Sequence, residues 1–214
     1  MHSLAPHNQV TYDSSIHYLG TRWAINTTHE GRKNVRGIRT RHLQRCIDLQ
    51  LYMLSRFGRV LEVRLESHSN RYDVRNNIEW LKTRDKFLEK VQSRFGVAVM
   101  AWFRERGDES DYPHYHAVIW LNGHDVQDAS LIQSIWEKIH HDRDHAIPFD
   151  WERSRFEQSV MLHGKPKAVS DYAYRCSYIC KVSTKSACSG GYDFGCSHVP
   201  LPRIRTNDIN SGEQ

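Results

Sequence analysis

The short sequence His114-Tyr115-His116, followed by the apolar residues 117–120, constrains this chain more than any other stretch. On a β-strand, residues two positions apart project from the same face, so the two imidazoles would lie side by side on a strand whose continuation is buried. Neutral imidazole is a good ligand for divalent metal ions. The alternative is a pair of ordinary surface histidines, because the chain contains 14 of them.

A second strand is predicted just upstream. Residues 97–105 form an apolar run that ends in Glu105, and the polar residues 106–111 read as a loop back to His114. Antiparallel pairing would bring Glu105 close to His114 and His116. A carboxylate beside two imidazoles suits Mg²⁺ or Mn²⁺ better than a structural zinc site, so we predict a Mg or Mn site here. Four other acidic residues could supply the third ligand: Glu66, Asp108, Glu109 and Asp111.

Residues 170–181 read as a helix. Ser170 and Asp171 favour a helix start, and no breaker follows before Lys181. Tyr174, Tyr178 and Lys181 then follow one another at spacings of four and three residues, which predicts that they share one helix face. Tyr172, Cys176 and Ile179 fall on the other side, where they can pack into a core. The alternative is a pair of half-buried tyrosines beside a solvated lysine.

Taken together, these stretches resemble the HUH superfamily of nicking-joining endonucleases. That superfamily carries a His-hydrophobic-His strand, a metal ion, and a downstream helix with one or two nucleophilic tyrosines and a lysine. The run Tyr174-Arg175-Cys176-Ser177-Tyr178-Ile179-Cys180-Lys181 is similar to its two-tyrosine signature, except that phage initiators usually carry lysine where this chain has Ser177. The Ser-Tyr-hydrophobic-x-Lys core most resembles inovirus-type replication proteins of filamentous phages and prophages (the YagK/YfjJ-like family). The resemblance covers residues 59 to 185.

The resemblance implies an α+β fold with an antiparallel HUH-type sheet of four to five strands and helices packed on it. It also implies metal-dependent, site-specific nicking and joining of a single-stranded DNA origin, which would start rolling-circle replication of a phage or prophage element. Tyr178 would be the nucleophile, Lys181 would assist it, and Tyr174 could serve a second transfer. A phenol is a poor nucleophile at neutral pH, and a metal ion and the Lys181 ammonium would both favour the phenolate.

Two other functions fit parts of the pattern. A catalytically silent, prophage-derived DNA-binding protein would keep the fold without the reaction. A plain metal-dependent hydrolase would need the histidines but no tyrosines beside the metal. The simultaneous presence of Glu105, His114, His116, Tyr178 and Lys181 favours the nicking enzyme.

The rest of the chain predicts three regions. Residues 1–38 read as a basic, partly flexible arm, residues 39–185 as the HUH-type endonuclease domain, and residues 186–214 as a tail. Within the domain, the patterns predict helices over 40–57 and 73–95 and from Asp128, and strands over 59–66 and 159–162; Ile78 is expected on the buried face of its helix. Five cations are candidate phosphate contacts, with a solvated surface as the alternative: Arg32, Lys33, Arg36, Arg39 and Arg41.

Net charge, apolar runs and cysteine content limit the partners and the location expected for this protein. A formal net charge of +5 permits nucleic-acid binding. No apolar run approaches the roughly 20 residues of a membrane helix, so we expect no membrane partner. Five cysteines without a secretion signal or a paired C-x-x-C design indicate reduced thiols and a cytoplasmic location. No G-x-x-x-x-G-K-[ST] phosphate loop is present, so a helicase and a polymerase would be separate host or phage proteins.

Overall fold

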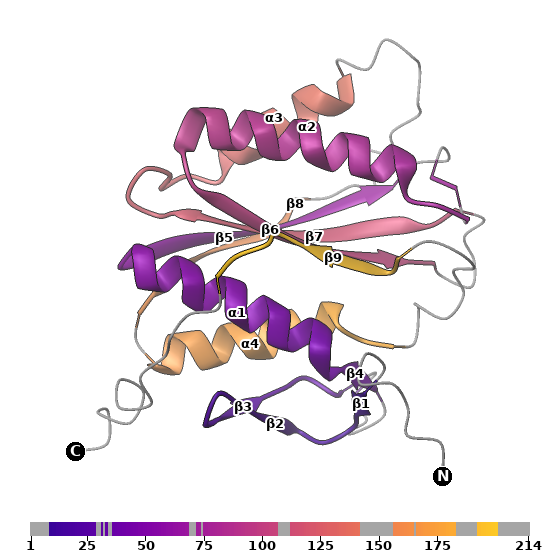
Figure 1. The fold of residues 1–214 in the computed structure, drawn as a ribbon, viewed down its shortest axis with the longest axis vertical. Coiled ribbons are helices and arrows are strands. Elements are labelled where there is room, and N and C mark those ends of the chain that lie inside the picture. Colours follow the sequence, from indigo (N-terminus) through magenta and orange to yellow (C-terminus); the bar gives the residue numbers. More distant parts are fainter. Residues whose placement is uncertain are drawn as a thin grey trace.

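The protein is an α+β structure built on one antiparallel sheet (Figure 1). The computed structural model describes residues 9–28, 31, 33, 36–68, 72–73, 75–106, 112–141, 156–164, 166–182 and 192–200. The sheet has five strands in the order β8 (Phe156–His163), β5 (Arg59–His68), β7 (His114–Asn122), β6 (Ala98–Glu105) and β9 (Phe194–Cys196). All neighbouring strands pair antiparallel. The predicted fold class and antiparallel sheet are confirmed.

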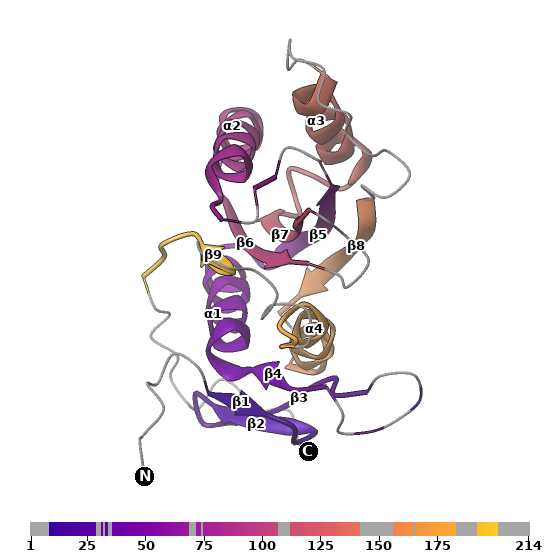
Figure 2. The ribbon, with the colours of Figure 1, turned by 90° about the vertical axis from the view of Figure 1, so that its right-hand side faces the viewer.

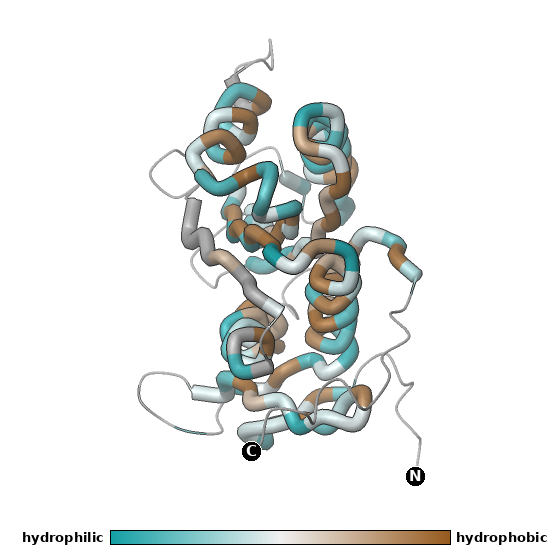
Figure 3. The backbone as a smooth tube through the Cα atoms, turned by 90° about the vertical axis from the view of Figure 1, so that its left-hand side faces the viewer, coloured by the Kyte–Doolittle hydropathy of each residue, from teal (hydrophilic) through white to brown (hydrophobic). Residues whose placement is uncertain are grey.

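Helices cover both faces of this sheet (Figures 1 and 2). On one face lie α2 (Ile78–Phe95) and α3 (Ser130–His141), and on the other lie α1 (Thr40–Arg56) and α4 (Pro166–Ile179). Figure 3 shows that the strands and the helix sides turned toward them are hydrophobic. Because side chains alternate along a strand, the sheet divides the interior into two cores. The α2–α3 side buries Trp80, Met100, Tyr115, Ala117, Ile119 and Trp136, and the α1–α4 side buries Leu43, Ile47, Ala101, Val118, Trp120 and Cys176.

The hairpin predicted from the sequence is present. Strands β6 and β7 pair with Glu105 opposite His114 and Phe103 opposite His116. The connecting residues 107–111, which include three of the alternative ligands, lie outside the described residues. Strand β5 pairs with the other side of β7 and is longer than predicted, since it continues to His68.

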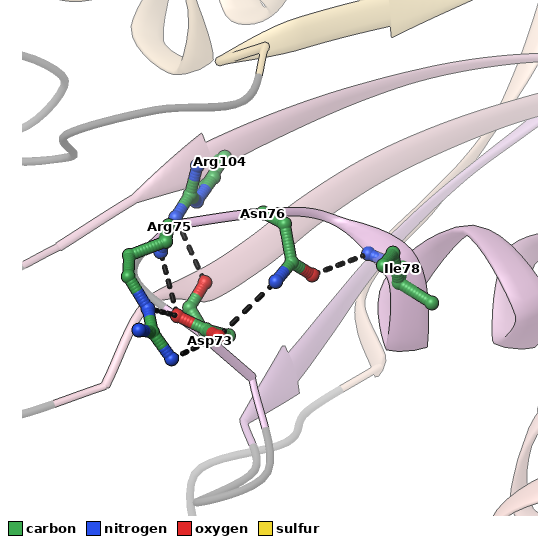
Figure 4. Close-up of polar contacts among 5 residues, drawn as sticks. All are labelled: Asp73, Arg75, Asn76, Ile78 and Arg104. Carbon is green, nitrogen blue, oxygen red and sulfur yellow. Dashed lines mark hydrogen bonds and ion pairs between the residues drawn. The ribbon is translucent and has the colours of Figure 1, made fainter.

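Helix α2 begins at Ile78, five residues later than predicted, because side chains compete for the backbone before it (Figure 4). Asp73 accepts a hydrogen bond from the backbone N–H of Arg75 (2.7 Å), and Asn76 accepts one from the backbone N–H of Ile78 (3.0 Å). Such local bonds favour turns over helix. Ile78 is 55% exposed, so its predicted burial is wrong, and Trp80 fills the core instead.

The same loop anchors the end of strand β6. The guanidinium of Arg104 is fully buried and donates to the backbone carbonyl of Asp73 (2.9 Å; Figure 4). Since neighbouring residues on a strand point to opposite faces, anchoring Arg104 on the α2 side directs Glu105 to the α1–α4 side.

Helix α4 differs from its prediction at both ends. It begins at Pro166, a residue favoured at the first helical position, and it ends at Ile179, before Lys181. Lys181 instead forms an isolated antiparallel bridge with Ile38. The prediction that Lys181 lies on the tyrosine helix is therefore wrong. Tyr172, Cys176 and Ile179 are buried, as predicted.

Described residues of the predicted arm and tail form β-strands. Strands β2 (Ser15–Tyr18) and β3 (Thr21–Ala24) form a hairpin, and β1 (Val10–Thr11) pairs with β4 (Ile38–Arg39). This part of the chain packs on the outer side of α1 and α4 and buries Ile16, Trp23 and Ile25 (Figure 2). In the predicted tail, β9 completes the sheet at the edge of β6.

No described helix has both the length and the apolar character needed to cross a bilayer.

The packing of β9 against β6 can be tested at Gly195. A Cβ atom added there would lie 2.5 Å from the Trp102 ring, whereas one added at Gly58 would meet nothing within 4 Å. We expect Gly195→Ala to lower the free energy of unfolding by about 1–3 kcal/mol through overpacking. Gly58→Ala should leave it unchanged or raise it by up to about 1 kcal/mol. Urea unfolding followed by circular dichroism measures both, and equal effects would contradict the position of β9.

Candidate functional site

The polar residues of the candidate site form two rows across the end of the sheet. Glu105, His114 and His68 lie opposite one another on β6, β7 and β5, and the next row contains Phe103, His116 and Glu66. Further along β7, the residues that point to the same face are Val118 and Trp120, which belong to the α1–α4 core. All these side chains therefore project toward α1 and α4 from one end of this face of the sheet.

Three of these residues could hold a metal ion. The Nε2 atoms of His114 and His116 lie 3.9 Å and 3.5 Å from Glu105 Oε2, and one ligand atom from each residue lies within 4.8 Å of the others. Two ligand atoms that each sit about 2.1 Å from one ion can be at most about 4.2 Å apart. The two distances meet this limit. Glu105 is 1% exposed and His116 6%, so water competes little for them.

Glu66 positions one of the two imidazoles. Its Oε1 lies 2.7 Å from His116 Nδ1, within ion-pair distance, while His116 Nε2 lies on the side of Glu105. Paired carboxylate and histidine side chains of this kind set the tautomer of metal-binding histidines. Glu66 Oε2 is 3.8 Å from His68 Nε2, and the His68 ring stacks on His114 with 4.6 Å between centroids. Glu66 was considered above as an alternative third ligand. Its carboxylate instead contacts His116 and His68.

The electrostatics of the cluster favour a cation. Burial lowers the pKa of His116, but the carboxylates of Glu105 and Glu66 outweigh it and raise that pKa above its ordinary value. Burial, together with the nearby His116 and His68, lowers the pKa of His114 to about 3. Burial raises the pKa of Glu66, yet hydrogen bonds with His116 and His68 bring it well below its usual range. His114 therefore keeps a free lone pair, while His116 attracts positive charge.

Lys181 connects the tyrosine helix to this cluster. Its Nζ lies 3.2 Å from Glu105 Oε2 and 4.7 Å from the centroid of the Tyr178 ring. Two arginines flank the same ring: Arg36 with its Cζ at 4.6 Å from the centroid and Arg64 at 5.8 Å. Three cations thus flank the Tyr178 ring, and one of them, Lys181, also contacts the candidate metal ligand Glu105.

Tyr174 has different surroundings. It is 39% exposed and lines a pocket together with Ser170 and residues of the β2–β3 region, one helical turn before Tyr178.

The predicted phosphate-contacting cations are dispersed. Arg36 is buried against Tyr178, Arg39 forms an ion pair with Asp193, Arg41 is exposed, and Lys33 lines the pocket beside Tyr174. Arg32 lies outside the described residues. Of the four described residues, Arg36 lies over the Tyr178 ring. Sequence reasoning missed the roles of Arg64, Glu66 and His68, although their alternation along 64–68 places them on one strand face.

Comparisons of the chain with protein-family models, with curated proteins and with solved structures found no match.

The placement of Glu66 predicts a loss of metal affinity when it is removed. Glu66→Ala should weaken Mn²⁺ binding about 10- to 100-fold, because His116 loses the partner that orients it. His114→Ala combined with His116→Ala should abolish binding. Glu89→Ala, which removes an exposed carboxylate from α2, is the control. Isothermal titration calorimetry measures the affinities, and a Glu66→Ala protein that binds like the control would contradict the assignment.

Metal binding should also release protons. The raised pKa of His116 favours its protonated form near neutral pH, whereas the pKa of His114, about 3, leaves it already free. A metal ion binds the unprotonated imidazole, so binding should release up to about one proton and weaken as the pH falls. Calorimetry in two buffers of different ionisation enthalpy counts the protons. A proton count of zero between pH 6 and 7, with affinity independent of pH, would be the opposite result.

Proposed function

We propose that this protein nicks and rejoins single-stranded DNA at a specific site through a covalent bond to Tyr178, and thereby initiates rolling-circle replication of a phage or prophage element. One observation carries the proposal: the Tyr178 ring lies beside Lys181, whose ammonium contacts Glu105 of the Glu105–His114–His116 cluster. A nucleophile candidate, a cation and a set of metal ligands are thus adjacent. The HUH-type sheet implied by the sequence is part of the same proposal.

The ligand set supports Mg²⁺ or Mn²⁺ as the cofactor. Glu66 and Glu105 carry two negative charges and Lys181 one positive charge, so the cluster with neutral imidazoles has an excess of negative charge. The raised pKa of His116 is a consequence of this excess. A divalent ion held by Glu105, His114 and His116 would polarise the scissile phosphate and offset the charge that develops on its oxygens.

The residues around Tyr178 fit the demands of the transfer. The phenolic oxygen attacks phosphorus and loses its proton; a P–O bond to tyrosine forms, the P–O3′ bond breaks, and the 3′ oxygen takes up a proton. The products are a 5′-phosphotyrosine link and a free 3′-hydroxyl, which can react in reverse to reseal the strand. Lys181, Arg36 and Arg64 supply positive charge that stabilises both the phenolate and the attacked phosphate.

The surroundings of Tyr178 weigh against a simple hydrolase, which would have no use for a phenol enclosed by three cations next to its metal ligands. A catalytically silent DNA-binding protein would not need Glu105 kept beside His114, His116 and Lys181 in a buried cluster.

Helicase and polymerase activities would come from separate proteins. The free, buried thiols of Cys46, Cys176 and Cys180 support a reducing compartment, which we take to be the cytoplasm.

Substitutions at the two tyrosines distinguish the nicking enzyme from a hydrolase and from a silent DNA-binding protein. Wild-type protein incubated with Mn²⁺ and labelled single-stranded oligonucleotides should retain label through denaturing gel electrophoresis. Tyr178→Phe should remove the adduct, because phenylalanine preserves the ring and lacks the nucleophilic oxygen. Tyr174→Phe should still form the first adduct, although a second strand transfer could be lost if Tyr174 performs it.

Peptide mapping by mass spectrometry identifies the modified residue. An adduct on Tyr174, Tyr172 or a serine would show that the nucleophile is wrongly assigned. Cleavage without any adduct would indicate a hydrolase, and specific DNA binding without cleavage would indicate the silent protein.

A further inference from the structure

A pocket of about 600 Å³ lies between the N-terminal segment and helix α4. This volume lies within the range of pockets that hold small ligands. Six of its lining residues carry hydroxyl groups: Ser14, Ser15, Thr27, Thr28, Ser170 and Tyr174. Hydroxyls donate to and accept from sugar and phosphate oxygens alike. The pocket is therefore suited to a ligand with many oxygen atoms.

The charged groups of the pocket favour an anion. Arg22 and Lys33 line it, and its lining in the described chain includes no carboxylate. Arg22 Nε donates to Ser15 Oγ at 3.0 Å across the β2–β3 hairpin, which holds the guanidinium at the pocket wall. Arginine binds phosphate through a planar fork of donors, and lysine binds it as a point charge.

The wall of the pocket is held in place by a chain of hydrogen bonds. The backbone N–H of Asn26 donates to Ser177 Oγ on α4 (2.7 Å), and Ser177 Oγ–H donates to the carbonyl of Tyr174 (2.6 Å). Asn26 Oδ1 also accepts from the backbone N–H and the hydroxyl of Thr28, at 3.1 Å and 2.6 Å. These bonds link the segment after β3 to the turn of α4 that carries Tyr174, so they hold this wall of the pocket in position.

The turn of α4 that lines the pocket precedes the turn that carries the candidate nucleophile. Ser170, Tyr174 and Tyr178 follow one another at intervals of four residues on α4, which places Tyr174 about 6 Å along the axis from Tyr178. About two nucleotides span that distance at the roughly 3.4 Å rise of a duplex strand. A strand whose phosphate lies at Tyr178 could thus place a neighbouring nucleotide beside Tyr174.

We propose that this pocket binds one nucleotide of the single strand flanking the scissile phosphate, with its base stacked on the Tyr174 ring and its phosphate held by Arg22 and Lys33. The proposal rests on the proposed function, which supplies the single-stranded substrate. It gives Tyr174 a role in holding the strand and leaves the covalent chemistry to Tyr178.

The test measures binding separately from cleavage. Fluorescence anisotropy with a 5′-labelled single-stranded oligonucleotide in EDTA reports binding alone. Tyr174→Ala should weaken binding about 5- to 100-fold, the range of one base–aromatic stack, while Tyr174→Phe should bind like wild type. Arg22→Ala combined with Lys33→Ala should lower the slope of log K against log salt by about 0.7, because the pair holds one phosphate and each phosphate contact on a single strand contributes about 0.7. Lys138→Ala on α3 and Tyr192→Ala, both at exposed positions, are the matched controls.

Adduct formation with Mn²⁺ is measured on the same proteins. Pocket-dependent binding together with a wild-type adduct would support both proposals. Pocket variants that bind like the controls, with an unchanged salt slope, would overturn the pocket assignment even if wild type forms its adduct. Pocket-dependent binding without any wild-type adduct would overturn the nicking function and leave the pocket standing. Arg22 and Lys33 are exposed, so their variants test the pocket even if Tyr174→Ala does not fold.

Discussion

The pairing register of three central strands is the constraint on which the site depends. With β7 between β6 and β5, His114 faces Glu105 on one side and His68 on the other, and His116 faces Glu66. A shift of one residue in either pairing would turn the carboxylates to the opposite face of the sheet. The apolar continuation of the same strands specifies the register, because Val118 and Trp120 must stay in the α1–α4 core. Hydrophobic burial at one end of the sheet thereby sets the geometry of the polar groups at the other.

The buried carboxylates illustrate how this arrangement is sustained. Glu62, two rows inside the site on β5, accepts hydrogen bonds from Trp120 (2.7 Å) and Gln50 (3.1 Å), which offset the cost of its burial. Nearer the end of the sheet that carries the site, Glu66 is balanced by His116 and His68, and Glu105 by Lys181. Each of these carboxylates therefore has a partner that offsets its burial, a neutral donor for Glu62 and a basic side chain for Glu66 and Glu105.

Local patterns in the sequence predicted the parts of the site that are local in the chain. The Glu105–His114 hairpin follows from two apolar runs and a polar loop, and the buried side of α4 follows from the spacing of Tyr172, Cys176 and Ile179. Contacts between distant segments were beyond such patterns. The pairing of Glu66 with His116 needs the order of the strands, and the position of Lys181 depends on a bridge to Ile38. The sequence pattern also did not predict the short strands β2, β3 and β9. They have three or four residues each, too few to show the alternation of polar and apolar residues that marks a strand.

The bridge between Ile38 and Lys181 also has a consequence for how the molecule forms. Arg39 N–H donates to the Cys180 carbonyl (2.9 Å) and Val182 N–H donates to the Gly37 carbonyl (2.8 Å), so two segments separated by most of the chain hold the lysine between them. Contacts of such long sequence separation carry a large loop-closure cost and tend to form late. The β6–β7 hairpin with its histidines needs no such closure. A growing chain would thus acquire its candidate metal ligands well before Lys181, and the candidate site would be complete only after synthesis had passed residue 182.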